Sequence, residues 1–478
     1  MIALQRVMAR SLGLGRGLSR PGARRWFRSR PESNQGECMS PMPRCAPAWV
    51  VLFCTFAVTA VASPPTAGDG QAVQRPANEG NAARISDEFL VNVGEGRDDN
   101  HATIAVEDDG HFSVVWSVKQ ECQECVGLSY FRRFDRHLTP ATGEVPVDST
   151  LGGQNHPDIG TDGHSFYVLA WDCRRPTRAE PSEFDLCARK FDIEGRPLGE
   201  AFPIMPDSSR KQEFPDVDVN SSGDVVILWT EENPDTLGDY HAQRFDSDLR
   251  PVGDRIRVNT VQSKYVGAPD IVMNDAGQFV AVWHQRFRAG MGEGETPFVD
   301  ADIFFRCFDA DGSPLTDPIK ADQDLLPHPS RPNAALMDNG TIVLSWRYRG
   351  HPVGLGRGVS ARAFDWTGAP LTDEFLLPAD AGDHSFPFVA GDNVGFLWTD
   401  HDASDAGIFG QMYSPKTREA STDVAMINQY QISQQLRPAA AAQTVGDSTY
   451  VVITWESRVP DQDDGSQGIY GRQVIFTK

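Results

Sequence analysis

The chain has 478 residues, of which 40% are hydrophobic and 9% aromatic, an ordinary composition for a globular protein that buries a sizeable core. Its formal net charge is −22 at pH 7, and residues 1–62 hold nine arginines but only two acidic residues, so the acidic excess lies in the rest of the chain. A surface this acidic repels phosphate backbones, which argues against nucleic acid as a partner and leaves solubility or cation binding as reasons for the charge.

The first element in chain order is an apolar stretch at residues 46–62 that ends in Ala-Val-Ala, the small-x-small pattern of a signal-peptide cleavage site. We interpret residues 1–62 as a leader and expect a secreted, periplasmic or cell-surface protein. Two explanations of the long preceding segment stay open: a translation start at Met39 or Met42, or a twin-arginine signal at Arg24 and Arg25. The stretch is too short for a transmembrane helix, and no other run of about 18 apolar residues follows it.

Residues 63–84 are rich in Pro, Gly, Ala and Asn and are expected to form a flexible linker. Seven copies of one unit then fill residues 85–478, and the clearest copy runs from Pro269 to Asp311. Each unit contains a valine-rich run that ends in tryptophan, and these tryptophans are 52–63 residues apart: Trp116, Trp171, Trp229, Trp283, Trp346, Trp398 and Trp455. Because the tryptophans recur in step with the apolar runs, we expect them to pack between units and not to stack on a ligand.

The pattern inside a unit predicts four antiparallel strands. A first strand commonly begins after a proline such as Pro269, a turn such as Ala276-Gly277 follows, and the second strand is apolar on both faces. After a loop of variable length, a third strand ends in a basic-aromatic-acidic triplet such as Arg244-Phe245-Asp246, and a fourth strand such as Asp254–Asn259 completes the unit. Seven such blades predict an all-β, seven-bladed β-propeller.

The two ends of the repeat predict how the ring closes. The seventh unit stops after its third strand, whereas Glu88–Asn92 resembles a fourth strand with no unit before it, as its Val91-Asn92 pair matches Val258-Asn259. We therefore expect the N-terminal strand to complete the last blade, which would leave no unpaired edge between first and last blades.

The unit, which reads Gly-x-Phe-Val-Val-Trp … Arg-Phe-Asp … Phe-x-Val-Asn, resembles a repeat of bacterial secreted and surface proteins that is thought to form β-propellers. The resemblance covers residues 85–478 and implies the fold, but its shared residues are turn and core residues and imply no activity. The sixth unit departs from the pattern, with Gln411-Met412-Tyr413 in place of Arg-Phe-Asp, and the first unit has His101-Ala102 where others have a proline.

Five cysteines follow the leader. In an oxidising compartment Cys122, Cys125, Cys173 and Cys187 are candidates for two disulfides, and we prefer Cys173 with Cys187 because they flank one loop. A single zinc site with four thiolates is the alternative. Cys307 lies within a strand and is expected to be a buried apolar residue.

Ligands usually bind propellers at the face formed by the loops between second and third strands, so we searched those loops. Three residues after the tryptophans, five of seven positions are cationic, and a ring of guanidinium groups on one face could grip a carboxylate or sulfate. The candidate ligand-binding residues are Arg174, Arg286, Arg349, His401 and Arg458. The alternative is that each is a solvated residue after a buried strand that pairs with nearby acids.

Acidic clusters are weaker candidates for calcium ligands: Asp400, Asp402, Asp405, Asp461 and Asp463. No cofactor is otherwise expected, and none of the usual hydrolase, zinc-helix or phosphate-loop motifs is present. For a glycosidase, Glu231, Glu232, Asp400 and Glu456 are carboxylates on the expected face, but nothing in the sequence pairs them.

These patterns favour an exported, monomeric propeller that recognises an extracellular polysaccharide or protein without catalysis. The alternative is a secreted hydrolase or lyase that acts on an acidic polysaccharide through an arginine-rich face. Propellers host both kinds of function, so the fold does not decide between them.

Overall fold

In the computed structural model the chain separates into two units, Met1–Pro76 and Ala77–Lys478, and every described residue belongs to the second. The structure describes residues 83–93, 98–119, 127–150, 153–174, 184–205, 210–232, 238–263, 266–286, 301–324, 328–349, 357–378, 382–401, 406–414, 419–430, 434–458 and 467–477. Over these ranges no helix is long and apolar enough to cross a membrane. The leader expected at residues 1–62 lies outside them.

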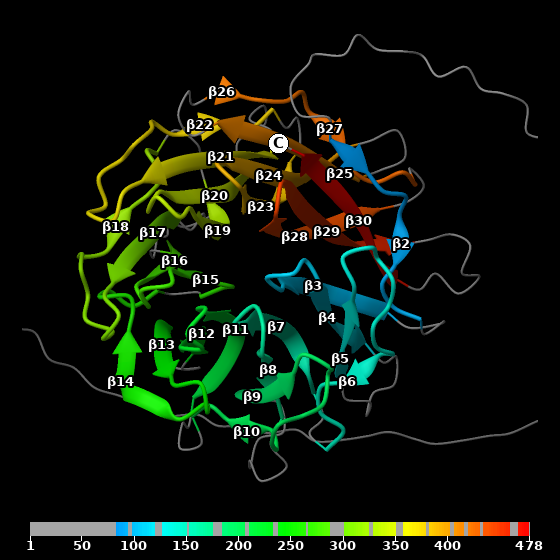
Figure 1. Ribbon diagram of the computed structural model, residues 1–478. Helices are drawn as coiled ribbons and strands as arrows, with labels where there is room; N and C mark the ends of the chain where they lie inside the picture. Colours follow the sequence, from blue (N-terminus) through cyan, green and yellow to red (C-terminus); the bar gives the residue numbers. More distant parts are fainter. Residues whose placement is uncertain are drawn as a thin grey trace, which may run out of the picture. The chain divides into compact units, whose positions relative to one another are not determined.

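The described residues form seven antiparallel sheets arranged as the blades of a propeller (Figure 1). Blades 1 and 2 contain β3 (Asp98–Val106), β4 (Phe112–Lys119), β5 (Leu128–Phe134), β6 (Val145–Pro146), β7 (Asn155–Thr161), β8 (Phe166–Cys173), β9 (Asp185–Asp192) and β10 (Phe202–Pro203). Blades 3 and 4 contain β11 (Lys211–Val219), β12 (Val225–Glu232), β13 (Asp239–Phe245), β14 (Pro251–Arg257), β15 (Asp270–Met273), β16 (Phe279–Arg286), β17 (Ala301–Phe308) and β18 (Ile319–Lys320).

Blades 5 and 6 contain β19 (Ser330–Leu336), β20 (Ile342–Arg349), β21 (Arg357–Phe364), β22 (Phe375–Leu376), β23 (Asp383–Ala390), β24 (Asn393–Asp400), β25 (Gly407–Ser414), β26 (Glu419–Ala420) and β27 (Ala425–Met426). Blade 7 contains β28 (Gln435–Val445), β29 (Ser448–Arg458) and β30 (Gln467–Thr477), together with β1 (Arg84–Ile85) and β2 (Phe89–Leu90) from the start of the described chain. The first strand of each blade lies next to the centre and the last strand at the rim (Figure 1). The predicted seven-bladed propeller is therefore confirmed.

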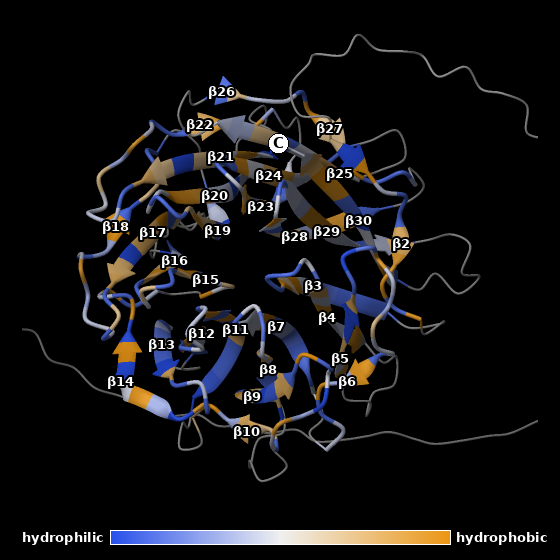
Figure 2. Cartoon of the chain, in the orientation of Figure 1, coloured by the Kyte–Doolittle hydropathy of each residue, from blue (hydrophilic) through white to orange (hydrophobic). Residues whose placement is uncertain are grey.

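The second strands form the core, as their unbroken apolar sequences predict. Every residue of β8 is buried, and the seven tryptophans of the repeat are at most 1% exposed. Figure 2 shows hydrophobic segments along the strands and mostly hydrophilic connections at the rim. The clusters of apolar side chains join neighbouring blades, for example β8 with β11 and β12, so each blade buries its face against the next.

The N-terminal segment closes the ring, as the sequence predicts. Phe89 and Leu90 pair with Gly471 and Tyr470 of β30, and β1 pairs with the same strand. The fully buried Val91 donates its N–H to Ile469, and the Asn92 side chain accepts the N–H of Ile469 at 2.8 Å. The closing segment is thus two short strands, and it begins one residue before the expected domain boundary.

An arginine in the third strand links most blades to their neighbours. Arg362 donates through Nη1 to the carbonyl of Ala321, in the fourth-strand segment of the preceding blade, at 2.9 Å. The same bond recurs in four other blades: Arg132 to Val91, Arg189 to Val147, Arg306 to Val258 and Arg472 to Ile427. In the sixth blade Gln411 takes the place of this arginine. A cavity of about 210 Å³ lies between blades 5 and 6, beside Tyr413.

Candidate functional site

A pocket of about 700 Å³ occupies the mouth of the central channel. Its wall comes mainly from the beginnings of the first strands, which surround the centre of the ring (Figure 1). It gathers imidazole and guanidinium groups from several blades. The ionisable residues that line it are His101, His156, His284, His384, Arg286, Arg331, Arg347, Arg437, Asp158 and Asp216. A volume of this size is within the range of small-molecule sites.

Six of the seven first strands place a residue here by the same backbone device. Each strand has a break in its pairing register, and at the break one residue other than glycine adopts a positive φ. These residues and their φ values are His101 (53°), His156 (44°), Phe214 (56°), Arg331 (51°), His384 (48°) and Arg437 (52°). All six line the pocket. A left-handed conformation costs such residues of order 1–3 kcal/mol, and strain of this kind concentrates at functional sites.

The prediction that first strands begin after proline holds for β15, which starts directly after Pro269, but the bulge corrects it for four other blades. In β7, β11, β19 and β28 the proline follows the left-handed residue and lies inside the strand. A proline is tolerated there because the bulge already interrupts the ladder of backbone hydrogen bonds. The recurring x-Pro pair therefore marks the pocket wall.

His156 is held by a buried carboxylate. Its Nδ1 lies 2.6 Å from Oδ2 of Asp172, which follows the core tryptophan of β8 and is fully buried. The other Asp172 oxygen accepts the N–H of Phe214 at 3.0 Å. Burial raises the pKa of Asp172 to about 6, although its hydrogen bond with His156 opposes the rise. Among the described residues nothing bonds Nε2 of His156, so this nitrogen is the one that can exchange a proton in the pocket.

His101 lies directly against His156. The two imidazole rings meet edge to face with centroids 4.5 Å apart, and the centroid of the Phe214 ring lies 4.4 Å from that of His156. Glu456 of β29 accepts the backbone N–H of His101 at 2.6 Å and also binds Arg437 at 2.9 Å. Burial, and then the charges of His156 and Arg437, lower the pKa of His101 well below its ordinary value.

The opposite part of the pocket is cationic. Arg331 contacts the ring of His384, and Arg347 contacts Ser330 at 3.0 Å and the carboxylate of Asp383. Burial, and then Arg331, lower the pKa of His384 to about 3. The pKa of His284 is lowered to about 3 by burial and then by neighbouring arginines. The imidazoles of His284 and His384 are therefore neutral at pH 7 while the guanidinium groups stay charged, an arrangement suited to an anion.

The structure brings one of the five loop candidates into the pocket, namely Arg286. Arg174 stacks over Phe184 at 4.9 Å, His401 bonds Asp400 through its backbone N–H, and Arg458 is exposed at the end of β29. The side chain of Arg349 lies outside the described residues. The remaining pocket residues could not be predicted from the loops, because they lie on the first strands, mostly at the bulges. The sequence signal that could have identified the residues at the bulges is the position before each recurring proline.

The cysteine and metal predictions have partial answers. Cys173 and Cys187 form the preferred disulfide, which excludes the zinc site that needed both as thiolates, and Cys307 is buried and free. Cys122 and Cys125 lie outside the described residues, as do the calcium candidates Asp402, Asp405, Asp461 and Asp463. Asp400 ends β24 and accepts the N–H of His401.

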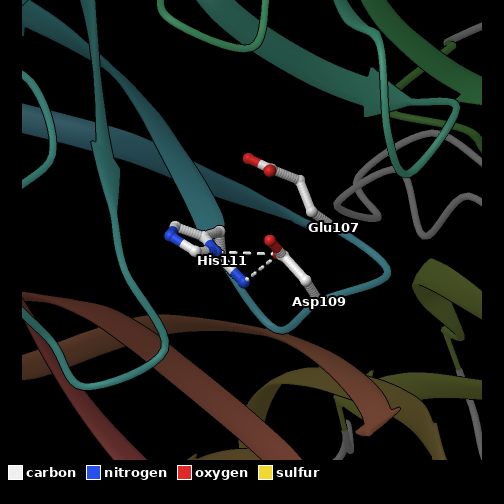
Figure 3. Close-up of side chains that lie close together, drawn as sticks. All are labelled: Glu107, Asp109 and His111. Atoms are coloured by element: carbon white, nitrogen blue, oxygen red, sulfur yellow. Dashed lines mark hydrogen bonds and ion pairs between the residues drawn. The ribbon is translucent and has the colours of Figure 1, made fainter.

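Acidic side chains gather at two other places, and in both of them several carboxylate oxygens already have partners within the protein. Figure 3 shows Asp109 bonded to His111 at the β3–β4 turn, and it shows no bond from the side chain of Glu107 to either of them. Glu107 instead receives two 2.6 Å hydrogen bonds from Arg133. In the second group, Asp302, Asp322 and Asp324 surround the ammonium of Lys320.

No family model matches the chain, and no curated protein matches it either. Among solved structures it is similar to a protein of unknown function from Dyadobacter fermentans, with a TM-score of 0.50, 11% identity and coverage of 83% of this chain and 99% of that chain. A polysaccharide lyase, an ulvan lyase bound to a saccharide of glucuronic acid and sulfated rhamnose, gives a TM-score of 0.54, 10% identity and coverage of 81% and 95%. An α-L-arabinanase from Penicillium chrysogenum gives a TM-score of 0.46 and 12% identity, with coverage of 70% of this chain and 100% of that chain. At these identities the likeness shows the fold alone.

Proposed function

We propose that the protein is an exported enzyme that binds an acidic polysaccharide at the channel mouth and cleaves it by β-elimination. The observation that carries the proposal is one pocket that holds both a cluster of arginines and the His156–Asp172 pair. This is the lyase form of the alternative reached from the sequence, and we prefer it to non-catalytic recognition because a plain binding site has no use for an oriented base.

The arginines supply the chemistry that an acidic sugar needs. Arg331, Arg347 and Arg437 come from blades 5 and 7 and converge on one side of the pocket. Planar guanidinium groups bind carboxylates and sulfates bidentately. Holding a uronate carboxylate there would neutralise its charge and make the neighbouring ring proton more acidic, which is the electrostatic part of an elimination.

His156 supplies the base. Asp172 fixes the proton of the imidazole on Nδ1, which leaves the lone pair of Nε2 for a substrate proton, and the carboxylate stabilises the imidazolium that forms. In the proposed step Nε2 takes the proton from the carbon beside the carboxylate. The electron pair becomes a carbon–carbon double bond as the adjacent bond to the leaving sugar oxygen breaks, and that oxygen gains a proton.

Two further observations are compatible with this role. The fold is shared with a lyase whose bound saccharide contains glucuronic acid and sulfated rhamnose, although shared fold does not transfer activity. The Cys173–Cys187 disulfide suits an oxidising compartment outside the cytoplasm, where such a polysaccharide would be met.

The test uses the chain from Ser63 with a panel of uronate-containing polysaccharides, sulfated and unsulfated. The ultraviolet absorbance of the unsaturated product reports elimination, and reducing ends report any cleavage. We expect absorbance with an acidic member of the panel, and we expect an Arg331→Ala/Arg437→Ala variant to lose it. The matched control is Arg174→Ala/Arg458→Ala, which removes two loop cations that lie away from the pocket.

The other outcomes are equally decisive. Reducing ends without absorbance would identify a hydrolase and refute elimination. Retention of a polysaccharide without any product would refute catalysis and support non-catalytic recognition instead. Loss of activity in the control variant but not in the pocket variant would move the site to the loops.

A further inference from the structure

Two carboxyl groups meet at the wall of the pocket. Asp216 of β11 lines the pocket two residues after the left-handed Phe214, and it is hydrogen-bonded to Asp270, which begins β15 in the next blade. Two carboxyl groups can share a hydrogen bond only if one of them carries a proton. The proposed mechanism above uses neither residue.

The surroundings indicate which carboxyl holds the proton. Asp270 accepts the backbone N–H of Ala334 through Oδ2 at 2.6 Å, and the nearby Asp158 accepts the N–H of Val217 at 2.7 Å. Among the described residues no backbone N–H donates to the carboxyl of Asp216. Hydrogen bonds from amides stabilise the ionised form, so the neutral form falls to Asp216.

The groups that act on Asp216 favour the same assignment. Burial raises its pKa well above the ordinary value, and the charges of Asp270, Asp158 and Asp218 raise it further. Asp270 comes from β15, Asp158 from β7 and Asp218 from β11 itself, so each element that brings a charge close to Asp216 brings a carboxylate. Like charges this close cannot all ionise at neutral pH.

We infer that Asp216 is the proton donor to the leaving sugar oxygen, with Asp270 holding the proton in place between turnovers. The inference rests on the proposed elimination and completes its balance: His156 removes one proton from carbon, the carbon–oxygen bond breaks, and Asp216 returns one proton to the departing oxygen. His156 and Asp216 line the same pocket, so base and acid can reach one bound sugar. The ligand class is therefore a uronate whose leaving group is a poorly acidic alcohol, which needs protonation to depart.

The experiment compares two uronate substrates that differ only in the leaving group, one a sugar and the other nitrophenoxide. Asp216→Asn should lower kcat on the sugar substrate by roughly 10²–10⁴-fold, the usual contribution of a general acid, but by less than about tenfold on the nitrophenyl substrate, whose leaving group needs no proton. A merely structural role would lower both rates alike. Asp248→Asn, which changes an exposed carboxyl on the turn between β13 and β14 that does not line the pocket, is the control and should leave both rates near wild type.

Asp270→Asn gives a second, independent variant. Removal of that charge should lower the pKa of Asp216, so the fall in activity at high pH should begin at lower pH than in the wild type. An infrared spectrum of the wild type should also show a protonated carboxyl at neutral pH that is missing in Asp216→Asn, a signal independent of turnover.

Two results would overturn the donor role while leaving the elimination intact. One is an equal loss of kcat on both substrates, and the other is an infrared carboxyl signal that is still present in Asp216→Asn. A wild type that is inert toward both substrates would overturn the elimination itself and the donor role with it, even if the carboxyl signal is present.

Discussion

The Nδ1 atom of His156 and the Oδ2 atom of Asp172 lie 2.6 Å apart, although the two residues stand on different strands of blade 2 and perform different structural tasks. Asp172 follows the core tryptophan and is fully buried, whereas His156 sits at a bulge beside the channel. The relationship connects the packed interior of the blade to a group that faces the ligand site.

Asp172→Asn should therefore damage catalysis more than binding. The amide cannot stabilise an imidazolium and no longer fixes the tautomer, so we expect kcat to fall by roughly 10²–10⁴-fold with little change in KM. In the wild type, activity should also decline as the pH falls through about 6, because Asp172 then takes up a proton. Steady-state kinetics between pH 5 and 8 measure both effects. Asp192→Asn, at the far end of β9, is the control, and a kcat equal to that of the control would rule out the pairing as functional.

The arginine link between blades predicts a stabilising substitution. Gln411→Arg should place a guanidinium against the fourth-strand segment of blade 5, as Arg362 does against blade 4, and raise the free energy of unfolding by about 1 kcal/mol. Arg362→Gln, the reverse change, should lower it by a similar amount. Denaturant unfolding of the two variants measures the difference. A Gln411→Arg protein less stable than the wild type would mean that the sixth blade cannot accommodate the longer side chain.

Ring closure predicts that the N-terminal segment is structural. A chain that begins at Val93 should unfold at a markedly lower temperature than one that begins at Ser63, because it loses both strands that pair with β30. Asn92→Ala tests the same point with one side chain, since it leaves the buried N–H of Ile469 without its acceptor and should cost about 1–3 kcal/mol. Equal melting temperatures for the long and short chains would show that the closure contributes nothing.

Much of the fold could be predicted because the core repeats itself. Trp283 and its six equivalents reveal the length of the repeat. Val91-Asn92 matches Val258-Asn259 in sequence because the two pairs do the same work: each Asn accepts a buried N–H of the neighbouring strand. Such contacts lie within one blade, so a single sequence can display them more than once.

The candidate site could not be predicted in the same way, because it depends on what differs between blades. His156, Phe214, Arg331 and Arg437 occupy equivalent bulges but belong to three residue types. The proline that follows each of them repeats in the sequence, but a proline does not by itself predict a positive φ at the residue before it. Arg286 was found because it follows a tryptophan at a fixed distance. The contact between Asp216 and Asp270 joins strands of different blades, and only ring geometry brings them together.

The carboxyl groups of Asp218 and Asp270 make the stability of the protein depend on pH, and the direction of this dependence follows from their pKa values. Burial raises the pKa of Asp218 to about 7 in the folded protein, against about 3.9 in an unfolded chain. The folded state therefore binds this proton more tightly than the unfolded state, so the contribution to stability is full below about pH 4 and is lost as the pH rises through about 7. Burial raises the pKa of Asp270 in the same direction, to about 7. We expect the melting temperature of the wild type to fall between pH 5 and pH 8, and Asp218→Asn to reduce this fall because the amide does not titrate. Asp248→Asn, on an exposed turn, should leave the slope unchanged. A slope identical in the Asp218 and Asp248 variants would mean that Asp218 does not hold its proton more tightly in the folded protein.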